Sequence, residues 1–163
     1  MKIRRAVTDD MIDFFELRNA EEVRKLAFNT DIIDLKTHKT WFTNQLNDPK
    51  SIMLVGEDRN TMVGQVRFTC LEGNSAEIHT AIFPEFFGQG SGQKIIRMGC
   101  QYLFANTTVE EVIAHILMTN TRSKHAFLKA GFGNETIVAF KGTECYRMVL
   151  RRKDDGDEPD KNC

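Results

Sequence analysis

The sequence lacks a long apolar run, a pair of neighbouring cysteines and an excess of charge of either sign. No stretch approaches the roughly 20 apolar residues of a membrane-spanning helix, so we expect a protein that does not cross a bilayer. The basic start, Met1–Arg5, is not followed by an apolar segment and is therefore not typical of a signal peptide. A net charge of −1 gives no reason to expect binding to nucleic acid or to anionic lipid.

The four cysteines lie far apart in the chain. They are Cys70, Cys100, Cys145 and Cys163. None belongs to a Cys-x-x-Cys pair or to a Cys/His cluster, so we expect no metal site. Free thiols fit a reducing compartment, which favours the cytoplasm. The first three lie among apolar residues and are interpreted as small core side chains.

The composition that remains is that of one globular domain. Its 163 residues are 41% hydrophobic and 28% charged, which is enough to bury a core without disulfides. There is no internal repeat and no linker, so a single domain is predicted over residues 1–152. Residues 153–163 are charged and hold no core residues, which favours a disordered tail.

The hydrophobic pattern predicts strands and helices in one mixed sheet. Expected strands are 2–7, 51–57, 61–71, 75–83, 110–117, 134–140 and 144–151, and expected helices are 20–27, 35–46, 93–105, 121–130 and one after residue 8. Thr8, Asn19 and Asp34 are predicted to cap the three early helices. Short polar turns join the three middle strands, which indicates an antiparallel meander. The predicted fold class is therefore α/β, with a mixed, mostly antiparallel central sheet flanked by helices.

The strongest motif is a glycine-rich loop between a strand and a helix. It reads Phe87-Gly88-Gln89-Gly90-Ser91-Gly92, with Gln93 after it. Glycine permits positive φ and close approach of a ligand, and loop amides ahead of a helix form a cradle for anions. The loop is not a dinucleotide fingerprint, because its strand lies in a meander, and no Gly-Lys-Ser/Thr follows as in a Walker loop. A plain connector is the alternative.

The loop resembles the acetyl-CoA signature of the GNAT acetyltransferases, Arg/Gln-x-x-Gly-x-Gly/Ala. A second landmark of that family stands here as Asn120-Thr121-Arg122-Ser123, followed by Lys129-Ala130-Gly131-Phe132. The two landmarks have the family's separation, and the order of elements matches over about the whole chain except the tail. The resemblance implies a single GNAT domain whose sheet is splayed at the acetyl-CoA site.

The resemblance also implies which residues bind acetyl-CoA, the expected cosubstrate. They are Ile82, Phe83, Phe87, Gly88, Gln89, Gly90, Ser91, Gly92, Gln93, Asn120 and Phe127. The loop amides would hold the pyrophosphate, while Ile82 and Phe83 would offer backbone groups to the pantetheine arm. Asn120 would contact the arm, cap the next helix, or both.

Two positions depart from the family pattern. Phe87 replaces the usual Arg or Gln, which removes one side-chain contact to phosphate. Phe127 stands where many members carry a Tyr that protonates the departing thiolate. Neither change need abolish catalysis, since a thiol with a pKa of about 8.5 leaves readily as thiolate near neutral pH.

Glu77 and His79 are the candidate general bases. They alternate on one face of the strand 76–83, which the family places at the centre of the sheet with its splayed end at the acetyl group. Relatives often carry Glu at the position of Glu77, so it is preferred, and a structural hydrogen bond is the alternative for either residue. His115 is interpreted as a strand residue with a satisfied ring, and His125 as a solvated helix residue.

The residues predicted to bind the acceptor are Arg18, Asn19, His38 and Trp41. The segments Leu17–Arg24 and Thr37–Phe42, which flank Phe28-Asn29, and the later Gly64–Phe68 resemble amino-sugar N-acetyltransferases of pseudaminic and legionaminic acid pathways. Those enzymes act on nucleotide-linked amino sugars, for which Arg would pair with phosphate and Trp would stack. The same opening is more loosely similar to ribosomal-protein N-terminal acetyltransferases. A helix pair that simply covers the sheet is the alternative.

The sequence therefore predicts acetyl-CoA-dependent transfer to a primary amine, on a nucleotide-linked amino sugar. Acetylation of a protein N-terminus or of a polyamine remains an alternative. So does a non-catalytic CoA-binding regulatory module, because the side chains usual at positions 87 and 127 are missing. The expected partner is a small-molecule or peptide amine, with no nucleic acid and no membrane. A homodimer is left open.

Overall fold

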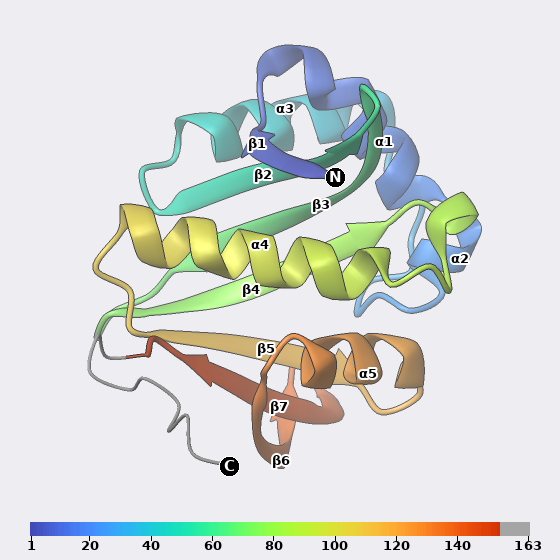
Figure 1. Ribbon diagram of the computed structural model, residues 1–163. Coiled ribbons are helices and arrows are strands. Elements are labelled where there is room, and N and C mark those ends of the chain that lie inside the picture. Colours follow the sequence, from blue (N-terminus) through green and yellow to red (C-terminus); the bar gives the residue numbers. More distant parts are fainter. Residues whose placement is uncertain (154–163) are drawn as a thin grey trace.

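The computed structural model describes residues 1–153 and contains one seven-stranded sheet (Figure 1). The strands are β1 (Lys2–Arg5), β2 (Ser51–Asp58), β3 (Thr61–Cys70), β4 (Ser75–Ile82), β5 (Glu111–Leu117), β6 (Gly133–Phe140) and β7 (Thr143–Arg151). Their order is β1-β2-β3-β4-β5-β7-β6, and only the β4–β5 pair is parallel. The predicted α/β class and meander are confirmed. Except for Lys153, the predicted tail lies outside the described residues.

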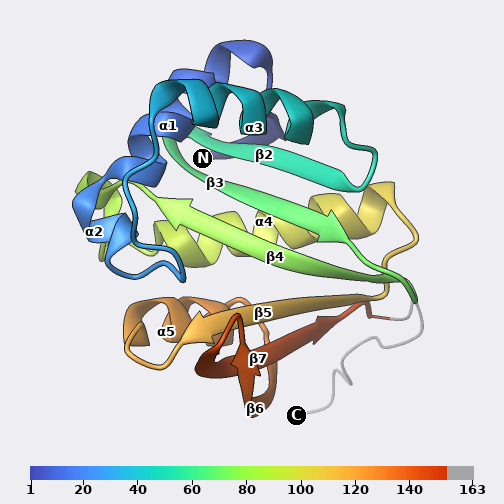
Figure 2. The same cartoon turned by 180° about the vertical axis from the view of Figure 1, so that it is seen from behind.

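Helices cover both faces of the sheet. The helices α1 (Met11–Asn19), α2 (Glu21–Arg24) and α3 (Leu35–Asn47) lie on one face, and α4 (Ser91–Asn106) and α5 (Thr121–Lys129) lie on the other (Figures 1 and 2). Short 3-10 turns stand at Thr8–Asp10 and Pro84–Phe86. In the part of the chain that the structure describes, no helix has the length and apolar character needed to cross a membrane.

Each face of the sheet has its own hydrophobic core. Under α4 and α5, inward residues of every central strand meet the apolar stripe of α4, which includes Ile95, Ile96 and Leu103. Helix α4 approaches β3 closely at Gly99, where a Cβ would lie 2.6 Å from a methyl of Val66. Under α1 and α3, a smaller core joins Phe14, Leu17 and Phe42 to Met53 and Val55. The helices of this face do not extend past β4. On this side of the sheet, β5, β7 and β6 are therefore not covered by a helix (Figure 2).

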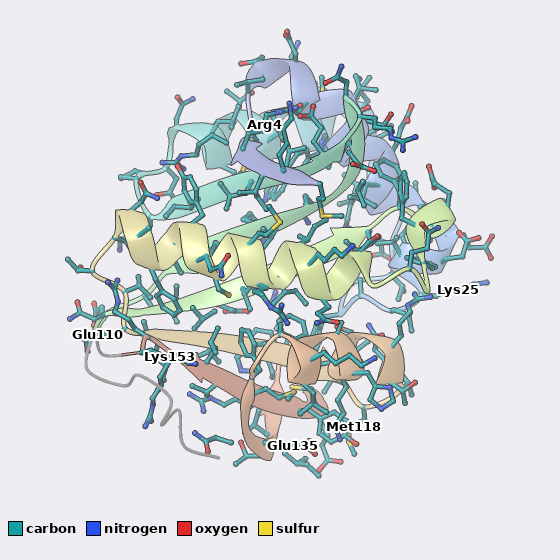
Figure 3. The ribbon with its side chains drawn as sticks, in the orientation of Figure 1. Arg4, Lys25, Glu110, Met118, Glu135 and Lys153 are labelled. Atoms are coloured by element: carbon teal, nitrogen blue, oxygen red, sulfur yellow. The ribbon has the colours of Figure 1, made fainter. Side chains whose placement is uncertain are left out.

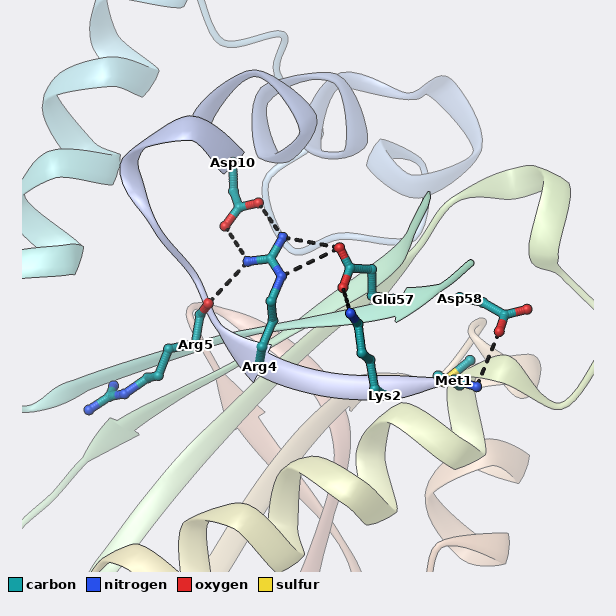
Figure 4. A network of polar contacts seen from close by, with 7 residues as sticks. All are labelled: Met1, Lys2, Arg4, Arg5, Asp10, Glu57 and Asp58. Atoms are coloured by element: carbon teal, nitrogen blue, oxygen red, sulfur yellow. Dashed lines mark hydrogen bonds and ion pairs between the residues drawn. The ribbon is translucent and has the colours of Figure 1, made fainter. Parts of the chain in front are cut away.

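The start of the chain is held by an ion-pair network around Arg4 (Figure 4). The Arg4 guanidinium donates two hydrogen bonds, of 2.7 and 2.8 Å, to the buried carboxylate of Asp10, which also accepts from the Val7 N–H. Burial alone would raise the pKa of Asp10, but the hydrogen bonds from Arg4 and Val7 outweigh it and lower the pKa below 3.8. Removing Arg4 would leave a buried charge unpaired, at a cost of about 3 kcal/mol.

The helix caps follow the sequence prediction only in part. Asp34 caps α3 as predicted, because its carboxylate accepts a 2.9 Å hydrogen bond from the Thr37 N–H. Thr8 makes no side-chain cap bond, and the carboxylate of Asp10 holds that turn instead. Asn19 does not cap α2, whose N-cap is Ala20. Asn19 is unavailable as a cap because its side-chain amide bonds to a longer-range partner, Ile33.

Strands β4 and β5 pair only near their starts. The parallel register runs from Ser75 opposite Glu111 to Glu77 opposite Ile113 and then stops. Beyond that point the two strands diverge, and Figure 3 labels Glu110 and Met118 at the closed and open ends of β5. The result is a wedge in the middle of the sheet whose edges carry backbone groups without a neighbouring strand.

Candidate active site

The glycine-rich loop forms an open turn ahead of α4. Gly88 has a φ of 75° and Gly90 a φ of 74°, and Gly90 is the N-cap of α4. A Cβ built on either residue would meet no protein atom within 4 Å, so space for a ligand lies against the backbone. The helix begins at Ser91, two residues earlier than predicted, which places the amides of Ser91, Gly92 and Gln93 in its first turn. Such a turn suits a phosphate group.

The wedge exposes backbone groups of alternate β4 residues. The Phe83 N–H donates to the Val63 carbonyl, and the Leu71 N–H donates to Ser75, so odd-numbered residues of β4 bond to β3. The even-numbered residues face β5, and past the last pair these are Ile78, Thr80 and Ile82, of which Thr80 and Ile82 lie furthest from the pairing. The backbone groups of Ile82 therefore lie at the free edge of β4, and their contact with the pantetheine arm stays a prediction. Phe83 does not offer free backbone groups, because its N–H and its carbonyl are both used, the latter by the Phe86 N–H.

The remaining predicted donor residues differ in what they contact. The Asn120 side chain accepts from the Ser123 N–H and caps α5, so the capping interpretation holds. Phe127 is 3% exposed and packs edge-on against Phe132 in the core, which places it away from a surface ligand. The Gln89 side chain donates to the Glu85 carbonyl within the loop.

Three titratable side chains come together on the uncovered face of β4 and β5. The Glu77 carboxylate lies 3.3 Å from Nε2 of His79 and 3.7 Å from Nδ1 of His115. Glu77 and His79 are two residues apart on β4, while His115 is two residues beyond Ile113, the β5 partner of Glu77. The side chains of Glu77 and His115 are 17% and 15% exposed. A ligand can therefore reach both side chains at a place that is partly shielded from water.

Burial and positive neighbours keep both imidazoles neutral. Burial, followed by the charges of Arg67 and Lys141, lowers the pKa of His79 from 6.5 to about 3. Burial also lowers the pKa of His115, and Arg147 adds to this effect while Glu77 opposes it. A histidine that resists protonation so strongly is a weak base. The arrangement therefore favours Glu77 over His79 as the general base.

Aromatic side chains enclose this cluster from a distant part of the chain. The His115 ring stacks on Phe140, near the β6–β7 turn, with centroids 3.9 Å apart and planes 4° apart. Phe140 in turn meets Phe28, from the loop between α2 and α3, edge-on at 5.2 Å. The loop and the hairpin thus touch across the open face of the sheet, beside the polar cluster.

Two of the four predicted acceptor residues have structural roles instead. The Asn19 side-chain amide bonds to both the N–H and the carbonyl of Ile33, which ties down the loop before α3. His38 is 2% exposed, its Nε2 lies 3.1 Å from the Met11 carbonyl, and burial lowers its pKa. Neither is free to bind an acceptor. Sequence spacing placed His38 on the correct helix, whereas Asn19, predicted to cap the second helix, is the last residue of α1. The polar groups of both are bonded within the protein.

The other two predicted acceptor residues remain available. Trp41 is 38% exposed, and its ring lies 5.4 Å from the guanidinium of Arg67. Arg18 donates to the Asn29 carbonyl through Nη2, but its Nη1 is buried without a hydrogen-bond partner. Burial, followed by the charge of Arg24, lowers the pKa of Arg18. A buried donor without a partner is costly, and a bound ligand is one way to satisfy it.

Unpartnered polar atoms gather on the α1–α3 side of the sheet. Within residues 1–153, the buried side-chain atoms that lack a partner are Arg18 Nη1, Gln65 Oε1 and His115 Nδ1. Gln65, on β3, lies opposite Ala81, and so follows Glu77 and His79 along the same face. All three belong to elements that border the uncovered face of β4, which makes this face a candidate binding surface.

The sequence interpretation missed His115, Arg67 and the two phenylalanines Phe28 and Phe140. His115 was assigned a satisfied ring, yet its Nδ1 has no hydrogen-bond partner within 3.5 Å. Strand periodicity could have found it, because His115 shares the outward face of β5 with Ile113. The phenylalanines left no such signal, since their contact depends on how a loop and a hairpin fold over the sheet.

Comparisons with known proteins agree with this geometry. A family model described as an acetyltransferase (GNAT) domain matches residues 1–133. No curated protein sequence matches the chain. Among solved structures, the aminoglycoside acetyltransferase AAC(6')-Ib with paromomycin and acetyl-CoA has a TM-score of 0.82 at 16% identity, covering 93% of each chain. Spermidine N-acetyltransferase from Vibrio cholerae, with CoA and spermine, has a TM-score of 0.82 at 18% identity, covering 92% of this chain and 94% of that one.

These similar structures are enzymes for aminoglycosides and for spermidine, so the narrower resemblance to amino-sugar enzymes remains a prediction. The donor features do fit acetyl-CoA, because the Gly88–Gly90 turn is open to a phosphate and the wedge exposes backbone groups beside it. The family match covers most of the chain. The protein therefore belongs to the GNAT acetyltransferase family and is an enzyme that transfers an acetyl group from acetyl-CoA to an amine.

Proposed function

We propose that the acceptor is a primary amine on a molecule that also carries an anionic group, such as a nucleotide-linked amino sugar. The charge of the acceptor side supports this proposal. The charged groups that act most on His79 and His115 are three cations, Arg67, Lys141 and Arg147, and one carboxylate, Glu77. A polycationic acceptor would meet repulsion there, whereas a phosphate would be attracted.

Two arginines supply the strongest part of this argument. Arg67 is held by Gln45 at 3.2 Å and by Thr69 at 3.4 Å, and within residues 1–153 it forms no ion pair with a carboxylate. Burial lowers the pKa of Arg67, with Glu77 opposing the shift. Arg18 likewise lacks an ion pair in the described part of the chain and keeps one buried nitrogen unpartnered. Guanidinium groups in this state are suited to bind phosphate or carboxylate oxygens.

The same positive charges assist the chemistry. An amine attacks only when neutral, and an unperturbed amine with a pKa near 10 is mostly protonated at pH 7. Neighbouring cations lower the pKa of a bound amine, because they disfavour its ammonium form. Glu77, whose carboxylate lies 3.3 Å from Nε2 of His79, would then accept the proton released on attack.

The donor side supplies the acetyl group as the thioester of acetyl-CoA. The backbone of Thr80 and Ile82 at the wedge would hold the donor in extended form beside β4. The departing thiolate needs no partner from position 127, where the buried Phe127 ring carries no proton. Catalysis would thus depend on deprotonation of the amine by Glu77 and on positioning of both substrates.

The acceptor proposal is tested by a CoA-release assay with three panels of amines. These are nucleotide-linked amino sugars, the polycations spermidine and kanamycin, and short peptides with free N-termini. We expect turnover in the first panel, with a KM that rises with ionic strength because the attraction between opposite charges is screened. Turnover confined to polycations or to peptides would refute the proposal and would leave donor binding untouched.

A further inference from the structure

The position that departs most from the family's donor motif carries an unusual contact. The Phe87 ring, in the glycine-rich loop, is covered by the guanidinium of Arg122, whose central carbon lies 3.5 Å from the ring centroid. Arg122 stands in the first turn of α5, two residues after the cap residue Asn120. The two landmarks, about 35 residues apart in sequence, are therefore joined by a direct side-chain contact.

The charge of the surrounding helices makes this arginine distinctive. Helices α4 and α5 contain no Asp or Glu, and their basic residues are Lys94, Arg97, Arg122, Lys124 and Lys129. Lys124 pairs with Glu135 at 2.9 Å, and Arg97 donates to the Lys129 carbonyl. Arg122 is exposed and, within residues 1–153, forms no ion pair or hydrogen bond through its side chain, so its contact with the ring leaves its N–H groups available.

We propose that Arg122, held flat against Phe87, binds a phosphate of the ADP half of acetyl-CoA. It would replace, from α5, the cationic or polar side chain that the loop lacks at position 87. Stacking on an aromatic face fixes the plane of a guanidinium while its edge stays free for bidentate contact with phosphate oxygens. Phe87 is then a positioning residue, and the open Gly88–Gly90 turn beside it provides the backbone part of the same site.

This inference concerns the donor and is independent of the acceptor proposed above. Its test is the dissociation constant of wild type, Arg122→Gln and Phe87→Leu for three donors, measured by calorimetry. Acetyl-CoA carries all phosphates, acetyl-dephospho-CoA lacks the 3′-phosphate, and acetyl-pantetheine has none. Lys129→Gln is the matched control, because it removes one exposed positive charge from the other end of α5.

For Arg122→Gln we expect the dissociation constant of acetyl-CoA to rise about tenfold, the range for loss of a charge-assisted contact, with acetyl-pantetheine unchanged. Phe87→Leu should give a smaller rise, since the arginine remains but is less ordered. A loss that persists with acetyl-dephospho-CoA assigns the contact to the pyrophosphate, and a loss that disappears assigns it to the 3′-phosphate. An equal loss with acetyl-pantetheine, no loss at all, or the same loss in Lys129→Gln would overturn the proposal.

Discussion

The donor side and the acceptor side of this enzyme are built from different kinds of atoms. On the donor side the proposed recognition groups are backbone: a turn with positive φ at Gly88 and Gly90, the first amides of α4 and the free edge of β4. On the proposed acceptor side they are side chains, Arg18, Trp41, Arg67, Glu77 and His115, and they come from five different elements. A backbone site depends on local conformation, whereas a side-chain site depends on how the whole sheet is assembled.

This difference has a consequence for substitutions. The donor side can lose the usual side chain at position 87 and keep its cradle, because loop conformation holds the amides in place. The acceptor side has no such reserve, because its groups are single side chains, and Arg18 Nη1 and His115 Nδ1 are buried without partners. A change of loop conformation should therefore damage the donor side most, and a single side-chain change should damage the acceptor side most.

The largest effect is expected from Gly90→Val. Valine is disfavoured at a φ of 74°, and its side chain would occupy the open space that faces the phosphate. At a hundredfold excess over Kd, acetyl-CoA should stabilise wild type by about 2.7 kcal/mol, and this stabilisation should be absent in the variant. Thermal unfolding with and without millimolar acetyl-CoA measures it.

Gly73→Val is the matched control for strain. Gly73 has a φ of 73° in the β3–β4 turn, and a Cβ there also meets nothing within 4 Å. Both variants should lose similar stability without ligand, but only Gly90→Val should lose the response to acetyl-CoA. If both respond as wild type does, the loop does not hold the donor.

The next largest effect is expected from Glu77→Gln. Glutamine keeps the size of the side chain but cannot accept a proton, so kcat should fall by roughly 10²-fold. Affinity for acetyl-CoA should not change, since Glu77 lies on the face opposite α4 and α5. Glu111→Gln is the control, because the Glu111 carboxylate lies on the same side of β5 as His115 and binds Arg151 at 3.1 Å. Full kcat in Glu77→Gln would assign deprotonation to another group or to solvent.

The contrast between the two sides also explains what could be predicted from sequence. Element order, the meander and the glycine-rich turn can be predicted from alternation, turn residues and local motifs. The predicted elements are confirmed, and for most of them the boundaries shift by one or two residues. The family assignment, which rested on two such motifs, is confirmed, and the non-catalytic alternative is not retained. Gly90 is the N-cap of α4 and Ile82 lies beyond the β4–β5 pairing, while their contacts with acetyl-CoA stay a prediction.

Side-chain roles were harder to predict because they depend on distant partners. Asn19 and His38 have the residue types of a binding site, but Ile33 and Met11 use their polar groups. Nothing in its own strand suggests a functional role for His115. It lies beside Glu77 only because β5 runs parallel to β4, a pairing between segments about 35 residues apart. Helical or strand spacing predicts on which face of its element a side chain lies. It does not predict which residue of another element contacts that side chain.

A smaller effect is expected from changes in the acceptor side's recognition groups. Arg18→Gln and Trp41→Ala should each raise KM for a nucleotide-linked amino sugar about tenfold, the range for loss of a charge-assisted or stacking contact. Affinity for acetyl-CoA should stay nearly unchanged, since α1 and α3 lie on the other face of the sheet from α4. Steady-state kinetics provide the values, with Lys39→Gln, an exposed cation on α3, as the control. Unchanged KM in both variants would remove these residues from the acceptor site.

The smallest effect is the pH dependence of stability caused by the imidazoles of the acceptor side. Native His79 stays neutral down to about pH 3, whereas the unfolded chain takes up a proton near its ordinary pKa of 6.5. The unfolded state therefore binds more protons between these values, so His79 makes the protein less stable as pH falls from 6.5 towards 3. His115 and His38 have lowered pKa values and act in the same direction. His79→Gln should flatten the decrease of Tm between pH 7 and pH 5, while His125→Gln, which changes an exposed histidine of α5, should not. Equal slopes in wild type and His79→Gln would mean that His79 takes up its proton as readily in the folded protein as in the unfolded one. Arg67 and Lys141 would then not suppress positive charge beside Glu77, and the argument for a neutral bound amine would lose its basis.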